Sequence, residues 1–536
     1  MITAIVNREL YRYEIHSLLK AFYPREEVKV LTQEAAQSRK YQRIAQDPFM
    51  EIRFEKSGVT LSFCGGNASA TAESTAYSSN AASAAAGSAA SAAESSAADS
   101  AASAAERTAA APEGADFTEK STELKTALKH LLYNALAERE QRTLPWGELI
   151  GIRPTKIAMN TLLQGGSAEE AAAAMERDHL VSPEKALLSA QIAQRERQIL
   201  SGIHYEGGYS LYVGIPFCPT TCLYCSFPSN NLALWQDRVD AYLDTLEREV
   251  EASSALMKDL VLDTVYIGGG TPTTLEPRQL ERLFTMLEKF FPMERLQEFT
   301  VEAGRPDSIT QDKLRVIRAH GVSRISVNPQ TMNEETLRLI GRRHTVDQVR
   351  EAFHMCREAG FDNINMDIIL GLPGEGVEEV RRTLEEIEKL SPDNLTVHSL
   401  ALKRGSRMHR IMEEKGISYM QNADASLTDR CMDLAAQAAA RMGMAPYYLY
   451  RQKNISGNLE NVGYARPGKA GMYNILIMEE KQSILALGAG SISKAVFPGG
   501  RIERSDNCKD VGTYLENIDE MIDRKIRLGI GKDTDN

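Results

Sequence analysis

The chain has 536 residues, enough for about two to four domains, and a formal net charge of −11. This acidic balance argues against a general nucleic-acid or membrane-surface binder, and the absence of any run of about 18 apolar residues predicts no membrane span. The N-terminal residues do not resemble a secretory signal, and an odd number of cysteines, seven, does not suggest a disulfide framework. A cytoplasmic protein is the default expectation.

Residues 1–64 are predicted to form a small α/β unit. The apolar run at 2–7 indicates a strand, and residues 9–23 have the spacing of a helix. Residues 49–64 predict a hairpin with Ser57 and Gly58 at its turn.

Residues 65–113 are almost entirely alanine and serine at their centre. Such a composition buries too little apolar surface to offset its ordering entropy, so we expect a disordered linker or insertion. A solvated alanine-rich helix is the alternative. Residues 114–204 then predict a helical extension, with helices over 124–138 and 168–200.

From residue 205 to residue 425, short β-branched runs alternate with amphipathic helical segments. The runs are YSLYVGIPF, DTVYIGGG, FTVEAG, RISVNPQ, INMDIILGLP and LTVHSLAL. Six strand-then-helix repeats predict a parallel sheet, either open or curled into a barrel, in an α/β fold. Chemistry in such folds lies at the carboxyl ends of the strands. Residues 426–536 are expected to form a C-terminal accessory domain.

Three of the seven cysteines, Cys218, Cys222 and Cys225, follow the first strand of this region within eight residues. One short loop can direct three thiolates to one face of an iron–sulfur cluster and leave one iron open to a small molecule. Zinc is the main competitor, although structural zinc usually takes four ligands from two separated pairs. A disulfide would use only two of the thiols. The remaining four cysteines have the surroundings of packed or surface thiols.

Other unusual residues follow the later strands. The second strand ends in GGGTPT, where glycines let the backbone approach a ligand closely or simply form a tight turn. Glu302 ends the third strand, Gln330 ends the fourth, and Asp367 lies on the fifth. A carboxylate at a strand end can hold ribose hydroxyls, and a paired surface charge is the alternative for each one alone.

Together these motifs resemble the radical S-adenosylmethionine (SAM) enzymes, whose signature is C-x3-C-x2-C after a first strand. LYVGIPFCPTTCLYC, YIGGGTPT, VEAGRPD, SVNPQ, GRRH and MDIILGLPGE are similar to the strand-end motifs of the oxygen-independent coproporphyrinogen III oxidase group. LPWGELIGIRPTKI and YRQKNISGNLENVGYARPG resemble its coproporphyrinogen dehydrogenase branch. The resemblance implies a partial (β/α)6 radical SAM barrel.

The resemblance also implies a 4Fe–4S cluster held by Cys218, Cys222 and Cys225, with SAM chelating the fourth iron. The resemblance implies that Tyr212 approaches SAM, and we also expect a catalytic role for this residue. The other implied SAM-binding residues are Tyr224, Gly269, Gly270, Thr271, Glu302, Gln330, Arg342, Asp367 and Ala401.

The implied activity is oxygen-independent oxidative decarboxylation of coproporphyrinogen III to protoporphyrinogen IX through a 5′-deoxyadenosyl radical. The implied partners are a tetrapyrrole substrate and a low-potential electron donor such as flavodoxin or ferredoxin. The carboxylates of the substrate would need cations, and candidates near the strand ends are Arg305, Arg324, Arg342, Arg343, Lys403 and Arg404.

A haem-binding chaperone on the same scaffold is the alternative function, and a structural iron–sulfur or zinc protein is the third reading. Phe227 lies where some members of the group carry a further cysteine, and relatives with an aromatic residue there include haem-handling proteins. Chaperone relatives also show a His-Asn pair followed by Tyr-Trp, whereas this chain has Tyr473 at the histidine position and no tryptophan after it. The loss of that imidazole removes a common axial ligand of haem iron.

Overall fold

The computed structural model describes residues 1–64, 106–110, 118–151, 153–205, 207–227, 229–401, 403, 405–414, 425–451 and 460–530. The chain divides into two compact units. Unit 1 contains Met1–Ile150 and Ala174–Lys185, and unit 2 contains Gly151–Ala173 and Ala186–Asn536. The predicted helical extension, 114–204, is therefore corrected: it is divided between the two units and does not form a region of its own. No described helix has both the length and the apolar character needed to cross a membrane.

Unit 1 contains a five-stranded sheet in the order β2-β1-β3-β4-β5. Its elements are β1 (Ile2–Val6), α1 (Arg12–Phe22), β2 (Val28–Thr32), α2 (Gln33–Gln37), β3 (Met50–Glu55), β4 (Gly58–Phe63), β5 (Glu106–Ala110) and α3 (Thr122–Arg139). The predicted strand, helix and hairpin of residues 1–64 are confirmed, with the hairpin turn at residues 56–57.

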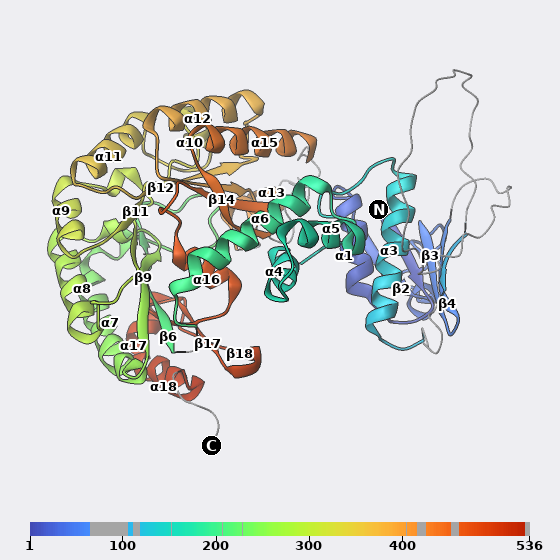
Figure 1. Cartoon of the computed structure of the whole chain (residues 1–536), viewed down its shortest axis with the longest axis horizontal. Helices are drawn as coiled ribbons and strands as arrows, with labels where there is room; N and C mark the ends of the chain where they lie inside the picture. Colours follow the sequence, from blue (N-terminus) through green and yellow to red (C-terminus); the bar gives the residue numbers. More distant parts are fainter. Residues whose placement is uncertain are drawn as a thin grey trace. The chain divides into compact units, whose positions relative to one another are not determined.

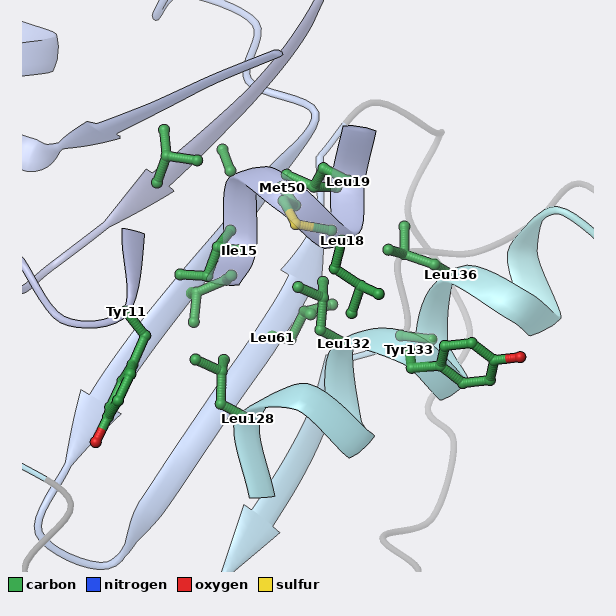
Figure 2. Packing of buried hydrophobic residues seen from close by; sticks show 14 of the residues in the cluster. Tyr11, Ile15, Leu18, Leu19, Met50, Leu61, Leu128, Leu132, Tyr133 and Leu136 are labelled. Atoms are coloured by element: carbon green, nitrogen blue, oxygen red, sulfur yellow. The ribbon is translucent and has the colours of Figure 1, made fainter. Parts of the chain in front are cut away.

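The core of unit 1 lies between its sheet and helices α1 and α3 (Figure 2). Leu18 and Leu19 of α1 and Leu128, Leu132 and Leu136 of α3 are at most 1% exposed. The leucines of α3 recur every four residues, and in α1 the buried Ile15, Leu18, Leu19 and Phe22 are three or four residues apart, so each set lies on one face of its helix. Each fully buried leucine contributes roughly 1.5–3 kcal/mol relative to an exposed one, so this packing, rather than helix propensity, holds the two helices.

Strand β5 corrects the expected extent of the linker. Glu106–Ala110 pairs antiparallel with β4, from Gly58↔Ala110 to Ser62↔Glu106, inside the segment predicted to be linker. Thr108 is β-branched and lies opposite Thr60, a pairing that suits an extended strand. The composition of the segment gave no indication of this strand. Its five residues are extended because the edge of the existing sheet supplies partners for their backbone hydrogen bonds. The rest of the predicted linker, 65–105 and 111–113, lies outside the described residues.

A buried carboxylate links the middle of α3 to later residues of unit 1. Glu148 is 2% exposed and accepts hydrogen bonds from Lys129 Nζ at 2.8 Å and from His179 Nδ1 at 3.1 Å. Burial opposes the ionisation of Glu148, but these two partners outweigh it, and the pKa of the carboxyl is lowered. Ionised Glu148 therefore stabilises unit 1.

Unit 2 is built on an eleven-stranded sheet whose central six strands are parallel neighbours. These strands are β6 (Gly208–Ile215), β9 (Val261–Gly269), β10 (Glu298–Glu302), β11 (Arg324–Ser326), β12 (Ile364–Leu370) and β13 (Asn394–Ser399). The helices between them are α7 (Val239–Ser254), α8 (Pro277–Phe290), α9 (Gln311–Ala319), α10 (Glu334–Leu339), α11 (Val346–Glu358) and α12 (Val377–Leu390). Six strand-then-helix repeats form the predicted partial barrel, with helices around the outside of the strands (Figure 1).

Strand alternation gives the barrel an apolar outer face and a polar inner face. Leu211, Val213 and Ile267 are fully buried, and successive side chains of a strand point to opposite faces. Tyr212 and Tyr266 lie opposite each other in register, on the face that does not carry these aliphatic residues. The inner face therefore carries the polar groups of a site.

The predicted C-terminal accessory domain, 426–536, is corrected because its strands extend the same sheet. The elements after β13 are α13 (Arg407–Glu414), α15 (Ala425–Arg441), β14 (Ala445–Arg451), β15 (Glu460–Ala465), α16 (Met472–Glu479), β16 (Ser483–Leu487), β17 (Ile492–Val496), β18 (Ile502–Asp506), α17 (Val511–Glu516) and α18 (Ile518–Leu528). β15 pairs antiparallel with β13, and β16 pairs parallel with β6. Unpaired edges of the six-stranded sheet are costly, and the C-terminal strands cover both of them.

Candidate active site at the carboxyl ends of the strands

The cysteine loop begins where β6 ends and is fastened to the end of β9. Within it, β7 (Phe217–Cys218) pairs with β8 (Asn230–Asn231). Gly270 N donates to Ile215 O at 2.8 Å, and Thr271 N donates to Phe217 O at 2.7 Å. The backbone before the first cysteine is therefore held against the glycine turn of the next strand.

The three thiols of this loop have different surroundings. Cys222 is buried, and Arg305 Nη1 donates to its sulfur at 3.8 Å. Cys218 Sγ lies 3.5 Å from Thr271 Oγ1. Burial raises the pKa of Cys218, and it raises the pKa of Cys225 to about 11. Both of these thiols are therefore protonated at neutral pH in the metal-free protein.

This donor set suits an iron–sulfur cluster. Among the described residues, no three Cys, His, Asp or Glu side chains already converge in the geometry of a metal site. The residue types, rather than their present geometry, fit a cluster. A single loop supplies three thiols, and Arg305 lies beside one of them, where it can balance the charge of a thiolate. Of the other four cysteines, Cys356 lies on the buried face of α11, as predicted.

The glycines at the end of β9 are required by the backbone itself. Gly269 has φ +105°, a conformation that side chains rarely allow. A Cβ on Gly270 would lie 2.5 Å from the carbonyl oxygen of Phe217. The structure thus supports the tight-turn explanation for these glycines, because it is the backbone of the cysteine loop that comes close to them.

Glu302 and an aromatic stack occupy the inner face beside this turn. Glu302 accepts a hydrogen bond from the Tyr266 hydroxyl, and burial raises the pKa of its carboxyl. The Tyr266 ring stacks on Tyr473 with centroids 4.5 Å apart, and Tyr212 lies 6.2 Å from Tyr266 and 6.3 Å from Tyr473. Sequence reasoning placed Tyr212 and Glu302 here but missed Tyr266, which the alternation of β9 could have indicated.

Gln330 and Asp367 are joined through the backbone. Gln330 has φ +67°, its N–H donates to Asp367 O at 2.9 Å, and its carbonyl accepts from Ile369 N at 2.9 Å. Asp367 accepts from Asn365 Nδ2 at 2.7 Å, and one of its oxygens lies 3.7 Å from His398 Nε2. Burial opposes ionisation of Asp367, but its polar neighbours lower the pKa.

Several buried polar atoms in this region lack hydrogen-bond partners among the described residues, and two of them belong to predicted site residues. These two are Gln330 Oε1 and Arg342 Nε. The other end of the Arg342 guanidinium is engaged, since Nη1 donates to Asn328 O at 2.6 Å. Unpaired buried polar atoms are costly, and clusters of them mark places where a bound molecule completes the hydrogen bonding.

The predicted residues thus follow adjacent strands along one edge of the sheet. Tyr212 lies on β6, Gly269 ends β9 and is followed by Gly270 and Thr271, and Ala401 lies two residues beyond β13. Tyr224 lies in the cysteine loop, where burial raises the pKa of its phenol.

The six candidate cations are not gathered in one place. Arg305 donates to Thr220 and pairs with Asp307, so it supports the cysteine loop. Arg324 is 1% exposed, whereas Arg343 and Lys403 are exposed. Arg342 is buried and donates to Asn328 O, and Arg404 lies outside the described residues. The position of Tyr473 beside Tyr212 could not be predicted from the sequence, because the two residues are 261 positions apart. Helix α16 brings Tyr473 into the barrel only once the sheet has formed.

Comparison with known proteins agrees with these motifs. The profile of the radical SAM superfamily matches residues 212–387. Oxygen-independent coproporphyrinogen-III oxidase-like protein HemZ of Bacillus subtilis (strain 168) is 41% identical over 403 residues, which are 74% of this chain and 79% of that protein. Heme chaperone HemW of the same organism is 35% identical over 206 residues, 38% of this chain and 54% of the chaperone.

A solved structure of coproporphyrinogen III oxidase (HemN) from Escherichia coli, described as a radical SAM enzyme, has a TM-score of 0.48 at 24% identity. The match covers 63% of this chain and 73% of the HemN chain.

The length and identity of the HemZ match, together with the superfamily profile over the barrel, establish the family. The chain belongs to the oxygen-independent coproporphyrinogen III oxidase-like family of the radical SAM superfamily, whose members bind a 4Fe–4S cluster and SAM.

Proposed function

We propose that this protein is a coproporphyrinogen dehydrogenase, which converts coproporphyrinogen III to protoporphyrinogen IX without oxygen. When bound, the cluster and SAM would supply a 5′-deoxyadenosyl radical that removes a hydrogen atom from a substrate propionate. Loss of carbon dioxide and of one electron to an acceptor would leave a vinyl group. Two such rounds would give the product.

In this proposal, the loop thiols hold the cluster and the strand ends hold SAM. Cys218, Cys222 and Cys225 would lose their protons on binding iron, and Arg305 would offset part of the thiolate charge. The SAM-side residues would be Tyr212, Tyr224, Gly269, Gly270, Thr271, Glu302, Gln330, Arg342, Asp367 and Ala401. The unpaired atoms Gln330 Oε1 and Arg342 Nε support this assignment, since a polar cofactor would supply their partners.

The observation that favours the dehydrogenase over the chaperone is the position of Tyr473. This residue stands where chaperone relatives have a histidine, and its ring is 4% exposed within the stack with Tyr266 and Tyr212. A phenol packed in this way is poorly placed to bind haem iron. Phe227, which is 68% exposed and resembles the chaperone cluster loop, favours the chaperone.

The deciding experiment is an anaerobic incubation of the reconstituted protein with SAM, dithionite and coproporphyrinogen III. Mass spectrometry should detect the loss of two carbon dioxide molecules per tetrapyrrole, with one 5′-deoxyadenosine formed per decarboxylation. Tight stoichiometric haem binding with SAM cleavage but no vinyl product would instead support the chaperone.

A further inference from the structure

A cavity of about 590 Å³ opens beside the cysteine loop of unit 2. Thr220 and Thr221, two of the three residues between the first two cysteines, line one wall together with Leu223. The connection after α10 and the start of α13 line the others. The tyrosines of the inner face do not border this cavity, so it is separate from the stack described above.

The rim of this cavity is basic in a chain that is acidic overall. Arg338, Arg343 and Arg407 line it, and all three side chains are exposed. None of them forms an ion pair or a side-chain hydrogen bond with another described residue. Glu334 is the one acid among the lining residues, and its carboxylate accepts from Val346 N at 2.7 Å.

A second cavity, of about 560 Å³, gives the contrast. It shares Arg338 and is lined by several glutamates. Its other arginines are paired: Arg350 lies 2.5 Å from Glu386, and Arg382 lies 2.7 Å from Glu379. Arg350 and Arg382 are thus neutralised by neighbouring carboxylates, whereas Arg338, Arg343 and Arg407 have no such partner among the described residues and are available to a partner from outside.

Residues of the cysteine loop itself line the first cavity. Thr221 and Leu223 of the lining directly flank Cys222 in the chain. Leu223 N donates to Ile340 O at 2.9 Å, so the cysteine loop is bonded directly to the segment after α10 that lines the cavity. A partner that rests on this face would place its own redox group next to the cluster without entering the barrel.

We propose that this basic face, Arg338, Arg343 and Arg407 around the 590 Å³ cavity, is the docking surface for an acidic electron-carrier protein. The inference rests on the proposed function, because the radical reaction consumes one electron for each SAM cleaved. A reduced low-potential flavin or iron–sulfur carrier loses one electron, and the oxidised cluster beside Cys222 gains it; no atom is transferred. Opposite charges guide such encounters and fix their orientation, at the cost of sensitivity to salt.

The first test measures binding. A bacterial flavodoxin, an acidic protein with bound flavin, is titrated onto the full chain, with and without reconstituted cluster, at low and high sodium chloride. The test variant is Arg338→Glu/Arg407→Glu. The matched control, Arg278→Glu/Arg315→Glu, makes the same change in net charge at exposed positions of α8 and α9. Cytochrome c serves as a basic probe protein.

The expected result is flavodoxin binding that weakens with salt, with a Kd at least about tenfold higher in the test variant because repulsion replaces two attractive contacts. The control variant should stay within about twofold of the wild type, and cytochrome c should not bind. An unchanged Kd in the test variant, or no binding of flavodoxin by the wild type, would overturn the proposal.

The second test separates this inference from the proposed function. SAM cleavage driven by dithionite needs no carrier protein, so the test variant should match the wild type there and fall behind only when reduced flavodoxin supplies the electrons. Circular dichroism melting checks that the variant is folded. If the variant loses coproporphyrinogen turnover with dithionite while flavodoxin binding persists, the arginines hold substrate carboxylates and the docking proposal fails. Absence of dithionite-driven cleavage in the wild type would refute the proposed function, while the binding test still decides the docking surface.

Discussion

A buried ion pair near the C-terminus should control the stability of the barrel. Lys525 of α18 is 1% exposed and lies 2.6 Å from Glu249 of α7, which is fully buried. The same carboxylate accepts from Gly488 N at 2.8 Å, from Tyr514 Oη at 2.6 Å and from Asn507 Nδ2 at 2.7 Å.

The pair also supports the strand that leads into the cysteine loop. A Cβ on Gly488 would lie 2.4 Å from Gly214 O, so this turn packs directly against the end of β6. Tyr242 Oη donates to the same Gly214 oxygen at 2.6 Å and accepts from Ala489 N at 3.1 Å. Loosening the turn at Gly488 should therefore loosen the backbone that precedes Cys218.

Lys525→Met should lower the free energy of unfolding of unit 2 by about 3 kcal/mol. Removing one partner of a buried pair costs about 3–5 kcal/mol, because the other charge stays buried without compensation. Three hydrogen bonds to Glu249 would remain, which favours the lower end of that range. The double variant Glu249→Gln/Lys525→Met removes both charges and should cost less than the single variant, about 1–2 kcal/mol.

The assay is urea unfolding followed by tryptophan fluorescence. The chain has two tryptophans, Trp146 in unit 1 and Trp235 in unit 2, and Trp235 lies near α17. A Trp146→Phe background therefore reports unit 2 alone. Arg524→Met, which removes an exposed ion pair of α18, is the control and should cost less than about 1 kcal/mol. A Lys525→Met cost as small as that of the control, or a double variant no more stable than the single one, would refute the reasoning.

Three further outcomes are expected. Cys222→Ala should prevent binding of a full cluster and abolish SAM cleavage, whereas Cys356→Ala should retain both; iron analysis and 5′-deoxyadenosine assays decide, and full iron content in the first variant would contradict the ligand assignment. Gly270→Ala should reduce SAM cleavage at least about tenfold, because its Cβ would press on the cysteine-loop backbone; wild-type activity would show that the turn adapts. Glu148 has a lowered pKa in the folded state, so its stabilisation is present above its ordinary pKa of 4.5 and is lost as the pH falls through the folded value. In Glu148→Gln, the free energy of unfolding of unit 1, followed by Trp146 fluorescence, should depend less on pH below about 4.5. At neutral pH the variant should be less stable, because the buried glutamine has no charge to interact with the neighbours of Glu148.

The sequence alone predicted the six parallel strands and the edge where their candidate site residues lie. Apolar runs alternating with amphipathic helices predicted the six parallel strands, because buried parallel strands and the helices that cover them have distinct periodicities. Strand ends share one edge, so Cys218, Glu302 and Asp367 could be assigned to a single site before any contact was known. Local spacing was sufficient for these features because each depends on residues close in the chain.

Only the tertiary structure decided which distant segments complete the sheet and the inner face. Glu106–Ala110 becomes a strand because β4 offers an unpaired edge, and β15 and β16 join the barrel for the same reason. Tyr473 stacks on Tyr266 because α16 enters the barrel. The carboxylate of Glu298, at the start of β10, accepts hydrogen bonds from the first backbone N–H groups of α16. These contacts join residues up to hundreds of positions apart. Their energy comes from pairing and burial that exist only once the barrel has formed, so no local pattern in the sequence records them.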